Sequence, residues 1–264
     1  MKRSGIITLT TDFGETDSYV GAMKGVILSI APGAKLVDIT HNVSPGNIEE
    51  ASFILKAAVP YFPPGTVHLA VVDPGVGSSR RPILVKSSGQ LFVGPDNGLF
   101  TDFIHGKAQV IHLTKKKFFL KRISNTFHGR DIFAPAAARL SLGKNPEEMG
   151  DPVRNPVLLK REMPKKTRDG IKGRVIHIDR FGNLITNIPE SMLPKNPLIR
   201  IAGREIKGLS KSYTGGRKGG PIAIIGSSWL LDISIRDKSA ARELKARVGT
   251  GVEVHTRTKK RSRK

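Results

Sequence analysis

The sequence predicts an α/β amino-terminal domain followed by a smaller carboxyl-terminal domain built mainly of β-strands. In residues 1–158, short apolar runs alternate with segments whose apolar residues recur at helical spacing, a pattern typical of a sheet covered by helices. In residues 169–256 the apolar runs are short and separated by glycine turns, which favours a small barrel or sandwich. The segment 151–170 is basic, helix-poor and punctuated by prolines, so we place the domain boundary there.

The composition narrows the class of protein. The chain has 264 residues, enough for two domains with a core each, and no cysteine, which excludes disulfides and thiolate zinc sites. The apolar run before Asp12 is too short for a signal peptide or a membrane span. The sequence therefore predicts a soluble protein of the cytoplasm.

Basic residues outnumber acidic ones by 44 to 22, for a formal net charge of +22. Such a chain attracts anions and can bind nucleic acid or a membrane surface loosely. The charge gathers at 115–122, 160–168 and 257–264, without a zinc finger or an aromatic ribonucleoprotein signature. Solvated basic faces are the simpler interpretation, so a nucleic acid is not the expected partner. Residues 257–264 are expected to be a disordered tail.

The elements of the first domain follow from apolar spacing and turn residues. Strands are expected at 6–10, 35–39, 67–72, 83–86 and 91–93, and the apolar character of 67–72 suits a strand buried on both faces. Helical spacing predicts helices from about 18 to 31, over 47–59, and from 134 to about 143.

The second domain repeats short strand patterns. They fall at 173–178, 184–188, 198–201, 205–209, 222–225, 230–235 and 252–256, with one helix expected near 239–247. Each pattern ends in a glycine or polar turn, so neighbouring strands are expected to be joined by short connections.

The stretch 71–81, Val-Val-Asp-Pro-Gly-Val-Gly-Ser-Ser-Arg-Arg, is the strongest candidate for a site. Asp73 falls at the carboxyl end of the buried strand, the edge at which open α/β sheets bind ligands. Arg80 follows seven residues later, far enough for the loop to fold back and pair the two side chains. A structural turn with a capping aspartate and a solvated arginine explains this stretch, taken alone, equally well.

Three more polar residues of the first domain lie at comparable positions. Asp12 ends the first strand, so its carboxylate and that of Asp73 are expected at one rim of one sheet. Asp17 stands where it can cap the following helix. His128 precedes a helix amino terminus, where free backbone N–H groups favour a negative ligand, although a capping or surface role is more common for such a histidine.

The second domain carries two polar loops. The segment from Asp179 to Asn183 connects two strands and is either a site or only a hairpin turn. The loop Gly226-Ser227-Ser228-Trp229 contains the only tryptophan, which belongs either to the core or to a stacking platform.

Five motifs, in this order, resemble the S-adenosyl-L-methionine hydrolase (adenosine-forming) family, the hydroxide adenosyltransferases related to fluorinases and chlorinases. They are Thr11-Asp12-Phe13-Gly14, Val72-Asp73-Pro74-Gly75-Val76-Gly77 with Arg80, Gly94-Pro95-Asp96-Asn97-Gly98, Phe127-His128-Gly129-Arg130 and Asp179-Arg180-Phe181-Gly182-Asn183. The resemblance covers about residues 6–256. It implies an α/β domain, a β-barrel-like domain, a homotrimer, and no metal or other cofactor. Because both domains carry substrate-type loops, we expect sites at subunit interfaces.

The resemblance also implies roles for individual residues. The catalytic Asp-Arg-His set falls on Asp73, Arg80 and His128, the ribose-diol carboxylate on Asp12, the methionine-end contacts on Asp17 and Asp179, and the nucleoside contacts on Asn183 and the loop around Ser227. Tyr19 and Gly46 stand where halogenating relatives carry a serine and a stacking tryptophan, so those two contacts do not transfer.

The implied reaction, hydrolysis of S-adenosyl-L-methionine to adenosine and L-methionine, suits these residues. A departing sulfonium becomes a neutral thioether and needs no general acid, so the reaction needs a positioned water. Arg80 can stabilise hydroxide character while Asp73 or His128 accepts a proton, and the sequence leaves open which of the two is the base. Local carboxylates can hold a cationic substrate on an otherwise basic chain.

Two other functions remain as alternatives. A halide-using relative carries a tyrosine, a threonine and a serine around the halide, where this chain has Asp73, Val76 and Gly129. A carboxylate at that position would repel a halide. A nucleic-acid-binding module driven by the basic surface would depend on the tail 257–264 and not on the polar loops.

Overall fold

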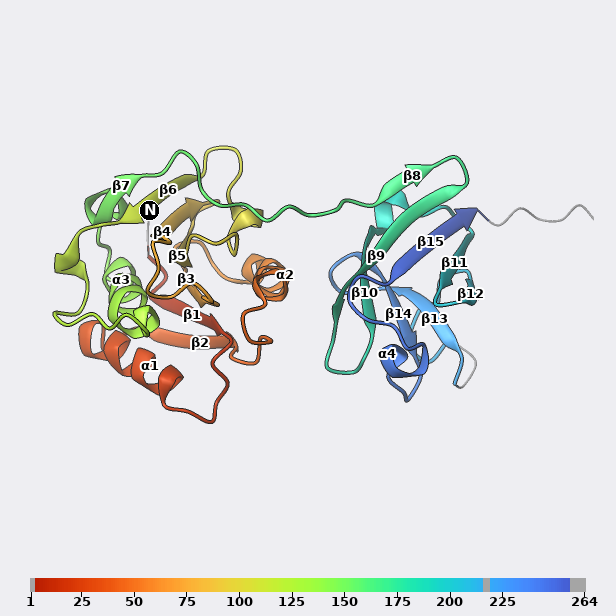
Figure 1. Ribbon diagram of the computed structural model, residues 1–264, viewed down its shortest axis with the longest axis horizontal. Helices are drawn as coiled ribbons and strands as arrows, with labels where there is room; N and C mark the ends of the chain where they lie inside the picture. Colours follow the sequence, from red (N-terminus) through yellow and green to blue (C-terminus); the bar gives the residue numbers. More distant parts are fainter. Residues whose placement is uncertain (1–2, 216–218, 257–264) are drawn as a thin grey trace, which may run out of the picture. The chain divides into compact units, whose positions relative to one another are not determined.

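The computed structural model describes residues 3–215 and 219–256, and the chain forms two compact units that divide after Lys160 (Figure 1). Residues 257–264, for which a disordered tail is expected, lie outside the described residues. Each unit has its own apolar core and is considered separately below.

The first unit is a seven-stranded sheet with helices on both faces. Its strands are β1 (Ile6–Thr11), β2 (Lys35–Thr40), β3 (Val67–Val71), β4 (Pro82–Ser87), β5 (Gln90–Pro95), β6 (Gln109–Leu113) and β7 (Gly150–Pro152). Its α-helices are α1 (Tyr19–Ile30), α2 (Ile48–Ala58) and α3 (Ala134–Ser141). Short helical turns are η1 (Val59–Tyr61), η2 (Thr101–Phe103), η3 (Lys116–Phe118), η4 (Gly129–Phe133) and η5 (Pro146–Met149).

The strand order of the first unit, β2-β1-β3-β5-β4-β6-β7, places the two strands that end in aspartates side by side. β2, β1, β3 and β5 are parallel, and β4, β6 and β7 are antiparallel to their neighbours. Thr11 of β1 pairs with Val71 of β3, so Asp12 and Asp73 follow the carboxyl ends of adjacent strands. The prediction that both residues lie at one edge of one sheet is confirmed.

Helices cover both faces of this sheet, which explains the apolar character of its central strand. Met23 of α1 and Ala137 of α3 belong to the core on one face, and Leu55 of α2 belongs to the core on the other. Figure 1 shows α2 on the opposite side of the strands from α1 and α3. Because every residue of β3 is buried, the strand has no solvent face and reads as a nearly continuous apolar run.

The second unit is an eight-stranded antiparallel sheet of order β12-β11-β15-β9-β10-β14-β13, with β8 added beside β9. The strands are β8 (Lys165–Thr167), β9 (Gly170–Ile178), β10 (Leu184–Pro189), β11 (Pro197–Ile201), β12 (Arg204–Lys207), β13 (Pro221–Ile225), β14 (Leu230–Ile235) and β15 (Gly251–Thr256), with short helices η6 (Glu190–Met192) and α4 (Ala240–Glu243). β12 and β13, at the two ends of the path, contact each other, so the sheet nearly closes. The predicted fold class, an α/β domain followed by a barrel-like β domain, is confirmed.

Two differences from the predicted elements have local causes. The helix expected over 239–247 is shorter in the structure, where α4 ends at Glu243. Lys245 adopts a φ of +50°, which is incompatible with a continuing right-handed helix. The structure also adds β6, β7 and β8, which the sequence pattern did not predict. β7 and β8 have three residues each and give no readable alternation.

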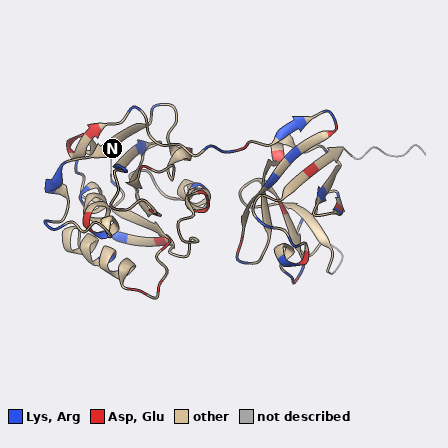
Figure 2. Ribbon diagram, viewed as in Figure 1, with Lys and Arg blue, Asp and Glu red and all other residues tan. Residues whose placement is uncertain are grey.

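The basic residues do not gather in one unit. Figure 2 shows lysine and arginine distributed over both units, with β8 forming one of the basic segments. Among the residues that the structure describes, no helix is long and apolar enough to cross a membrane.

Candidate active site

A buried carboxylate and guanidinium pair forms in the loop that follows β3. Arg80 Nε donates to both carboxylate oxygens of Asp73 at 2.9 Å, and Arg80 Nη2 donates to Asp73 Oδ2. The Arg80 and Asp73 side chains are only 9% and 5% exposed. The interpretation of Arg80 as a solvated residue of a structural turn is therefore wrong, and the two groups form a fixed, charge-assisted contact.

His128 joins this pair from another part of the chain. It occupies the N-cap position of η4, and Arg80 Nη2 donates to its Nδ1 at 3.0 Å. Because a guanidinium has no acceptor, Nδ1 is the acceptor, and a neutral ring carries its proton on Nε2. The Arg80 guanidinium also lies over the ring of Phe133, 5.1 Å from its centroid. The structure thus brings together the three predicted catalytic residues.

The electrostatic environment keeps His128 neutral. Burial lowers the pKa of its imidazole below 6.5, and the positive charge of Arg80 lowers that pKa further, while Asp73 and Asp131 act in the opposite direction. One donor atom of the cluster has no assigned contact: Arg80 Nη1 is buried and has no hydrogen-bond partner among the described residues. A neutral imidazole and a spare guanidinium donor therefore lie beside one carboxylate.

A glycine allows the two segments of this cluster to approach. Gly77 has a φ of +77°, and a Cβ atom at this position would lie 2.3 Å from the carbonyl oxygen of Asn125. Any larger residue would push the loop that carries Arg80 away from the segment that carries His128. The glycine-rich sequence after Asp73 thus serves a close approach of two backbones.

Arg81, next to Arg80 in the chain, also pairs with an aspartate, but this pair lies outside the cavity. Arg81 Nε donates to Asp96 Oδ2 at 2.8 Å, and Asp96 Oδ1 accepts from the backbone N–H of Val157. Arg81 also donates to Asn155, so this pair ties the end of the first unit to β5. It has a structural role and does not line the cavity described next.

A cavity of about 350 Å³ opens beside the Asp73, Arg80 and His128 cluster. It is lined by Phe13, Tyr19, Val71, Asp73, Val76, Ser124, Thr126, Phe127, His128, Gly129 and Arg130. Its position at the carboxyl edge of the parallel strands is the usual place for ligands in open α/β sheets. Among the residues that the structure describes, Asp73 is the only carboxylate that lines it.

The two other predicted carboxylates of the first unit lie outside the residues that line this cavity. Asp12 Oδ2 accepts from the backbone N–H of Gly46 at 2.8 Å, which fixes the loop after β2 against the end of β1. Asp17 is exposed, and Ser18 takes the N-cap position of α1 without a side-chain cap bond. The alternative interpretation, in which Asp17 caps α1, is therefore wrong.

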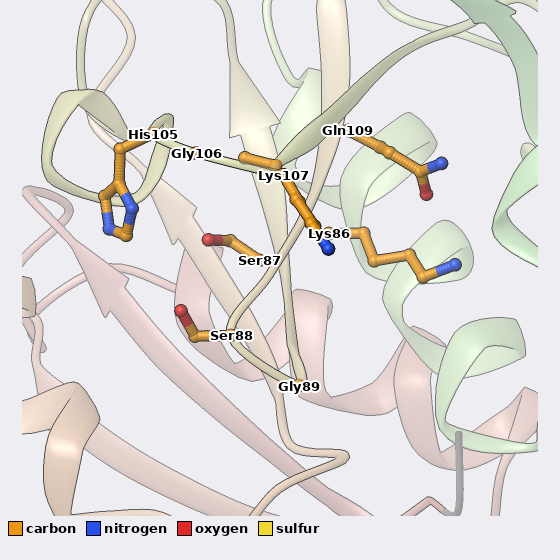
Figure 3. A pocket seen from close by; sticks show the side chains of 9 residues that line it. Lys86, Ser87, Ser88, Gly89, His105, Gly106, Lys107 and Gln109 are labelled. Atoms are coloured by element: carbon orange, nitrogen blue, oxygen red, sulfur yellow. The ribbon is translucent and has the colours of Figure 1, made fainter.

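A second cavity, of about 370 Å³, lies at the opposite edge of the sheet (Figure 3). Its lining includes Lys86, Ser88, His105 and Lys107 and no carboxylate. Gly89, which lines this cavity, accepts a hydrogen bond from the backbone N–H of Gly65, just before β3. The cavity therefore lies near the amino end of β3, whereas Asp73 follows its carboxyl end. Lys86 is already paired with Glu147 at 3.1 Å. Nothing in this lining recognises a cation.

In the second unit, Asp179 is tied into its own turn. Its Oδ1 accepts from the backbone N–H groups of Phe181 and Asn183 at 2.9 and 2.8 Å, and its Oδ2 accepts from Asn183 Nδ2 at 2.8 Å. This is an Asx turn between β9 and β10, so the hairpin interpretation describes its geometry.

Sequence reasoning missed Asp232, a buried carboxylate of β14. It is 6% exposed, and its Oδ1 has no hydrogen-bond partner among the described residues. Burial, followed by the charge of Asp179, raises the pKa of Asp232 to about 7. The signal was present in the sequence, because an acidic residue interrupts the otherwise mostly apolar run Leu230–Ile235.

The loop Gly226-Ser227-Ser228-Trp229 lies directly against Asp232. A Cβ atom at Gly226 would lie 1.9 Å from Asp232 Oδ2, so a larger residue there would displace the Asp232 carboxylate. Ser227 is exposed at the tip of this loop. Trp229 is 71% exposed, so the interpretation of this residue as part of the core is wrong. Among the described residues, no group of three or more His, Asp or Glu side chains is arranged to hold a metal ion.

Comparison with known proteins covers nearly the whole chain. The family model for the SAM hydroxide adenosyltransferase N-terminal domain matches residues 7–150, and the model for the C-terminal domain of the same family matches residues 173–253. These two matches fall on the α/β unit and on the barrel-like unit, respectively.

Individual relatives agree with the family models. The chain is 36% identical to an (R)-S-adenosyl-L-methionine hydrolase of Salinispora arenicola over 94% of this chain and 97% of the relative. It is 45% identical to a hydrolase of the same name from Methanocaldococcus jannaschii over 69% and 66% of the two chains. A crystal structure of an uncharacterized conserved protein from Thermotoga maritima superimposes with a TM-score of 0.89, at 36% identity, over 95% of this chain and 100% of that one. A fluorinase of Actinoplanes matches at 29% identity.

Proposed function

The chain belongs to the SAM hydroxide adenosyltransferase family, and from that premise we propose that it hydrolyses S-adenosyl-L-methionine to adenosine and L-methionine without a metal or other cofactor. The observation that carries this proposal is the contact of Arg80 with both Asp73 and His128 at the wall of a cavity. We place the activity in the cytoplasm, since a chain without cysteine gains nothing from an oxidising compartment.

In this proposal Arg80 positions the attacking water. Its Nη1 is the buried donor without a partner in the described chain, and it donates to the water oxygen as negative charge develops there. His128 orients the guanidinium by accepting at Nδ1, which leaves its Nε2–H as a second donor. Nδ1 already accepts from Arg80 and Nε2 already carries a proton, so the imidazole has no free acceptor. Asp73 is therefore the group that accepts the proton of the water.

The bonds and charges of this step balance. The water oxygen forms a bond to C5' of the ribose while the C5'–S bond breaks and its electron pair goes to sulfur, which becomes a neutral thioether. As this bond forms, the water passes one proton to the Asp73 carboxylate, so its oxygen takes on hydroxide character and becomes the neutral 5'-hydroxyl of adenosine. No general acid is required, because methionine leaves uncharged. The sulfonium and the carboxylate both become neutral in this step, and the burial of the Asp73 side chain, which is 5% exposed, favours this loss of charge.

The remaining predicted residues are proposed to bind the substrate. Asp12 Oδ1 accepts no hydrogen bond from the described part of the chain, and it is proposed to accept from the ribose diol. Asp17 and Asp179 are proposed to contact the methionine end, and Asn183 and Ser227 the nucleoside. For Asp179 this role is added to its structural role in the turn.

Halogenation is not proposed. The family resemblance places Asp73 where halide-using relatives carry a tyrosine, and a carboxylate there would repel a halide. The fluorinase match, at 29% identity, is also weaker than the hydrolase matches. Nucleic-acid binding through residues 257–264 is not proposed either, and these residues lie outside the described part of the chain.

Product analysis tests the proposal. The full chain is incubated with S-adenosyl-L-methionine with and without a chelator, and products are identified by mass spectrometry. Equal amounts of adenosine and methionine, unaffected by the chelator, are expected. Release of methylthioadenosine, or activity that the chelator abolishes and zinc or magnesium restores, would contradict it.

Acidification should lower the rate through His128. The pKa of its imidazole is lowered from the ordinary 6.5, and only the neutral ring can accept from Arg80. We therefore expect kcat to stay level at pH 6.5 and above, and to fall as the pH drops through that lowered pKa. His128→Asn offers a matched test, because an amide oxygen accepts from Arg80 and does not titrate. This variant should keep part of the activity and shift the acidic decline to lower pH. If kcat of the variant falls at the same acidic pH as that of the wild type, protonation of His128 does not cause the fall.

We further propose that the protein is a homotrimer in which each site uses residues of two subunits. The support is the resemblance to the family and the division of the predicted polar residues between both units of the chain. Asp73→Ala and Asp179→Ala are each expected to be inactive, and co-expression should regenerate intact sites at roughly one interface in four. No recovery in a mixture whose mass shows hybrid trimers would contradict the shared site.

A further inference from the structure

Three aromatic rings from separate segments meet in the wall of the cavity that contains Asp73 and His128. Phe13 follows β1, Tyr19 begins α1 and Phe127 precedes η4. The ring centroids lie 5.9 Å apart for Phe13 and Tyr19, 5.9 Å for Phe13 and Phe127, and 5.2 Å for Tyr19 and Phe127. Tyr19 remains 47% exposed, so a large part of its ring surface is open to a ligand.

The rest of the cavity lining offers little to a cation. Asp73 is the one carboxylate among the lining residues, and Arg80 neutralises it through three hydrogen bonds. Arg130 also lines the cavity and adds a positive charge. A positively charged ligand that enters therefore meets no free carboxylate there, and the aromatic rings are the groups that can attract it.

The ring of Phe127 already contacts the guanidinium of Arg130. The guanidinium carbon of Arg130 lies 5.0 Å from the centroid of Phe127, within the range of a cation and π interaction. Arg130 also pairs with Asp131. Of the three rings, that of Tyr19 belongs to the exposed residue. The ring cluster is thus suited to positive charge, and Tyr19, its exposed member, lines the cavity.

We propose that Tyr19, supported by Phe13 and Phe127, binds the positively charged sulfonium and so selects it over neutral thioethers of the same shape. This inference rests on the proposed function for the identity of the substrate. The attraction of a sulfonium to a ring face is electrostatic, whereas a neutral thioether gains only the packing contact.

The reaction predicts how this contact affects the kinetics. The positive charge on sulfur disappears as the C5'–S bond breaks, so the ring contact is stronger in the bound substrate than in the transition state. Loss of the ring should therefore raise KM for the substrate without lowering kcat. A residue that acts on the nucleophile would show the opposite pattern.

The test compares two ligands that differ in charge. Tyr19→Leu should raise KM for S-adenosyl-L-methionine about 5-fold to 30-fold without lowering kcat, and should change the inhibition constant of S-adenosylhomocysteine, the neutral thioether, less than about twofold. Tyr19→Phe keeps the ring and should restore most of the loss in KM. Tyr61→Leu is a matched control, because Tyr61 is 81% exposed and does not line the cavity.

Each other outcome is informative. An equal loss for both ligands would show packing without charge selection, and an unchanged KM or a reduced kcat in Tyr19→Leu would also overturn the inference. If the wild-type chain releases no adenosine, the proposed function fails, and calorimetry with the same two ligands still decides the role of Tyr19. A wild-type chain that binds neither ligand would overturn both.

Discussion

Replacing Asp73 with asparagine should lower kcat for hydrolysis of S-adenosyl-L-methionine by roughly a hundredfold or more while changing KM little. The amide has nearly the shape of the carboxylate and leaves Arg80 and His128 in place. It cannot take the proton that the attacking water loses, and it no longer balances the charge of the buried guanidinium. Steady-state kinetics at several substrate concentrations separate the two constants.

The chain offers a matched control for this substitution in Asp96→Asn. Asp96 is 4% exposed and pairs with Arg81, the residue next to Arg80, yet it does not line the cavity. Asp96→Asn should therefore lower thermal stability without lowering kcat, since in both variants an arginine loses the buried carboxylate that balances its charge. Similar kcat values for Asp73→Asn and the wild type would mean that the Asp73 and Arg80 pair is structural, like its neighbour.

Replacing Asp232 with asparagine should stabilise the fold at pH 8 and bring no gain at pH 4. Burial, then Asp179, raises the pKa of Asp232 to about 7, so ionising it in the folded chain costs up to about 4 kcal/mol. Below the ordinary carboxyl pKa of 3.8 the group is protonated in both states and costs nothing. The stability of the wild type should therefore fall as the pH rises from about 4 through 7, and the variant should lose this dependence.

Denaturant unfolding across this pH range measures the effect. Asp237→Asn is the control, because the Asp237 side chain lies in the same unit and is 69% exposed. It should follow the wild type at every pH. A constant difference between Asp232→Asn and the wild type from pH 4 to pH 8 would show that Asp232 keeps an ordinary pKa. Tyr213 is influenced by the same carboxylates, but it titrates above this range.

Much of the fold was predictable because its central elements are buried on defined faces. β3 is buried throughout, and α2 begins after Asn47, whose side chain accepts from Glu50 as an N-cap should. β7 and β8, with three residues each, carry no periodicity that a sequence pattern could reveal. The end of α4 depends on a left-handed Lys245, which no local preference of lysine predicts.

The candidate site was predictable in part. Asp73 and Arg80 lie seven residues apart on one glycine-rich loop, so their pairing follows from local geometry. The position of His128 beside them depends on a contact between residues 48 positions apart in the chain, which only the resemblance to a family could suggest. Asp232 was missed because it is a single acidic residue within a strand, and its nearness to Asp179 arises from the pairing of β14 with β10, the strand that follows the Asp179 turn.

The most direct test of the account is the fate of the water oxygen. The full chain is allowed to convert S-adenosyl-L-methionine in water enriched in heavy oxygen, and the products are analysed by mass spectrometry. The account predicts that the label enters the 5'-hydroxyl of adenosine and is absent from methionine, because water attacks C5' and sulfur leaves with its electron pair. Adenosine without the label, or label in methionine, would contradict attack of water at C5'.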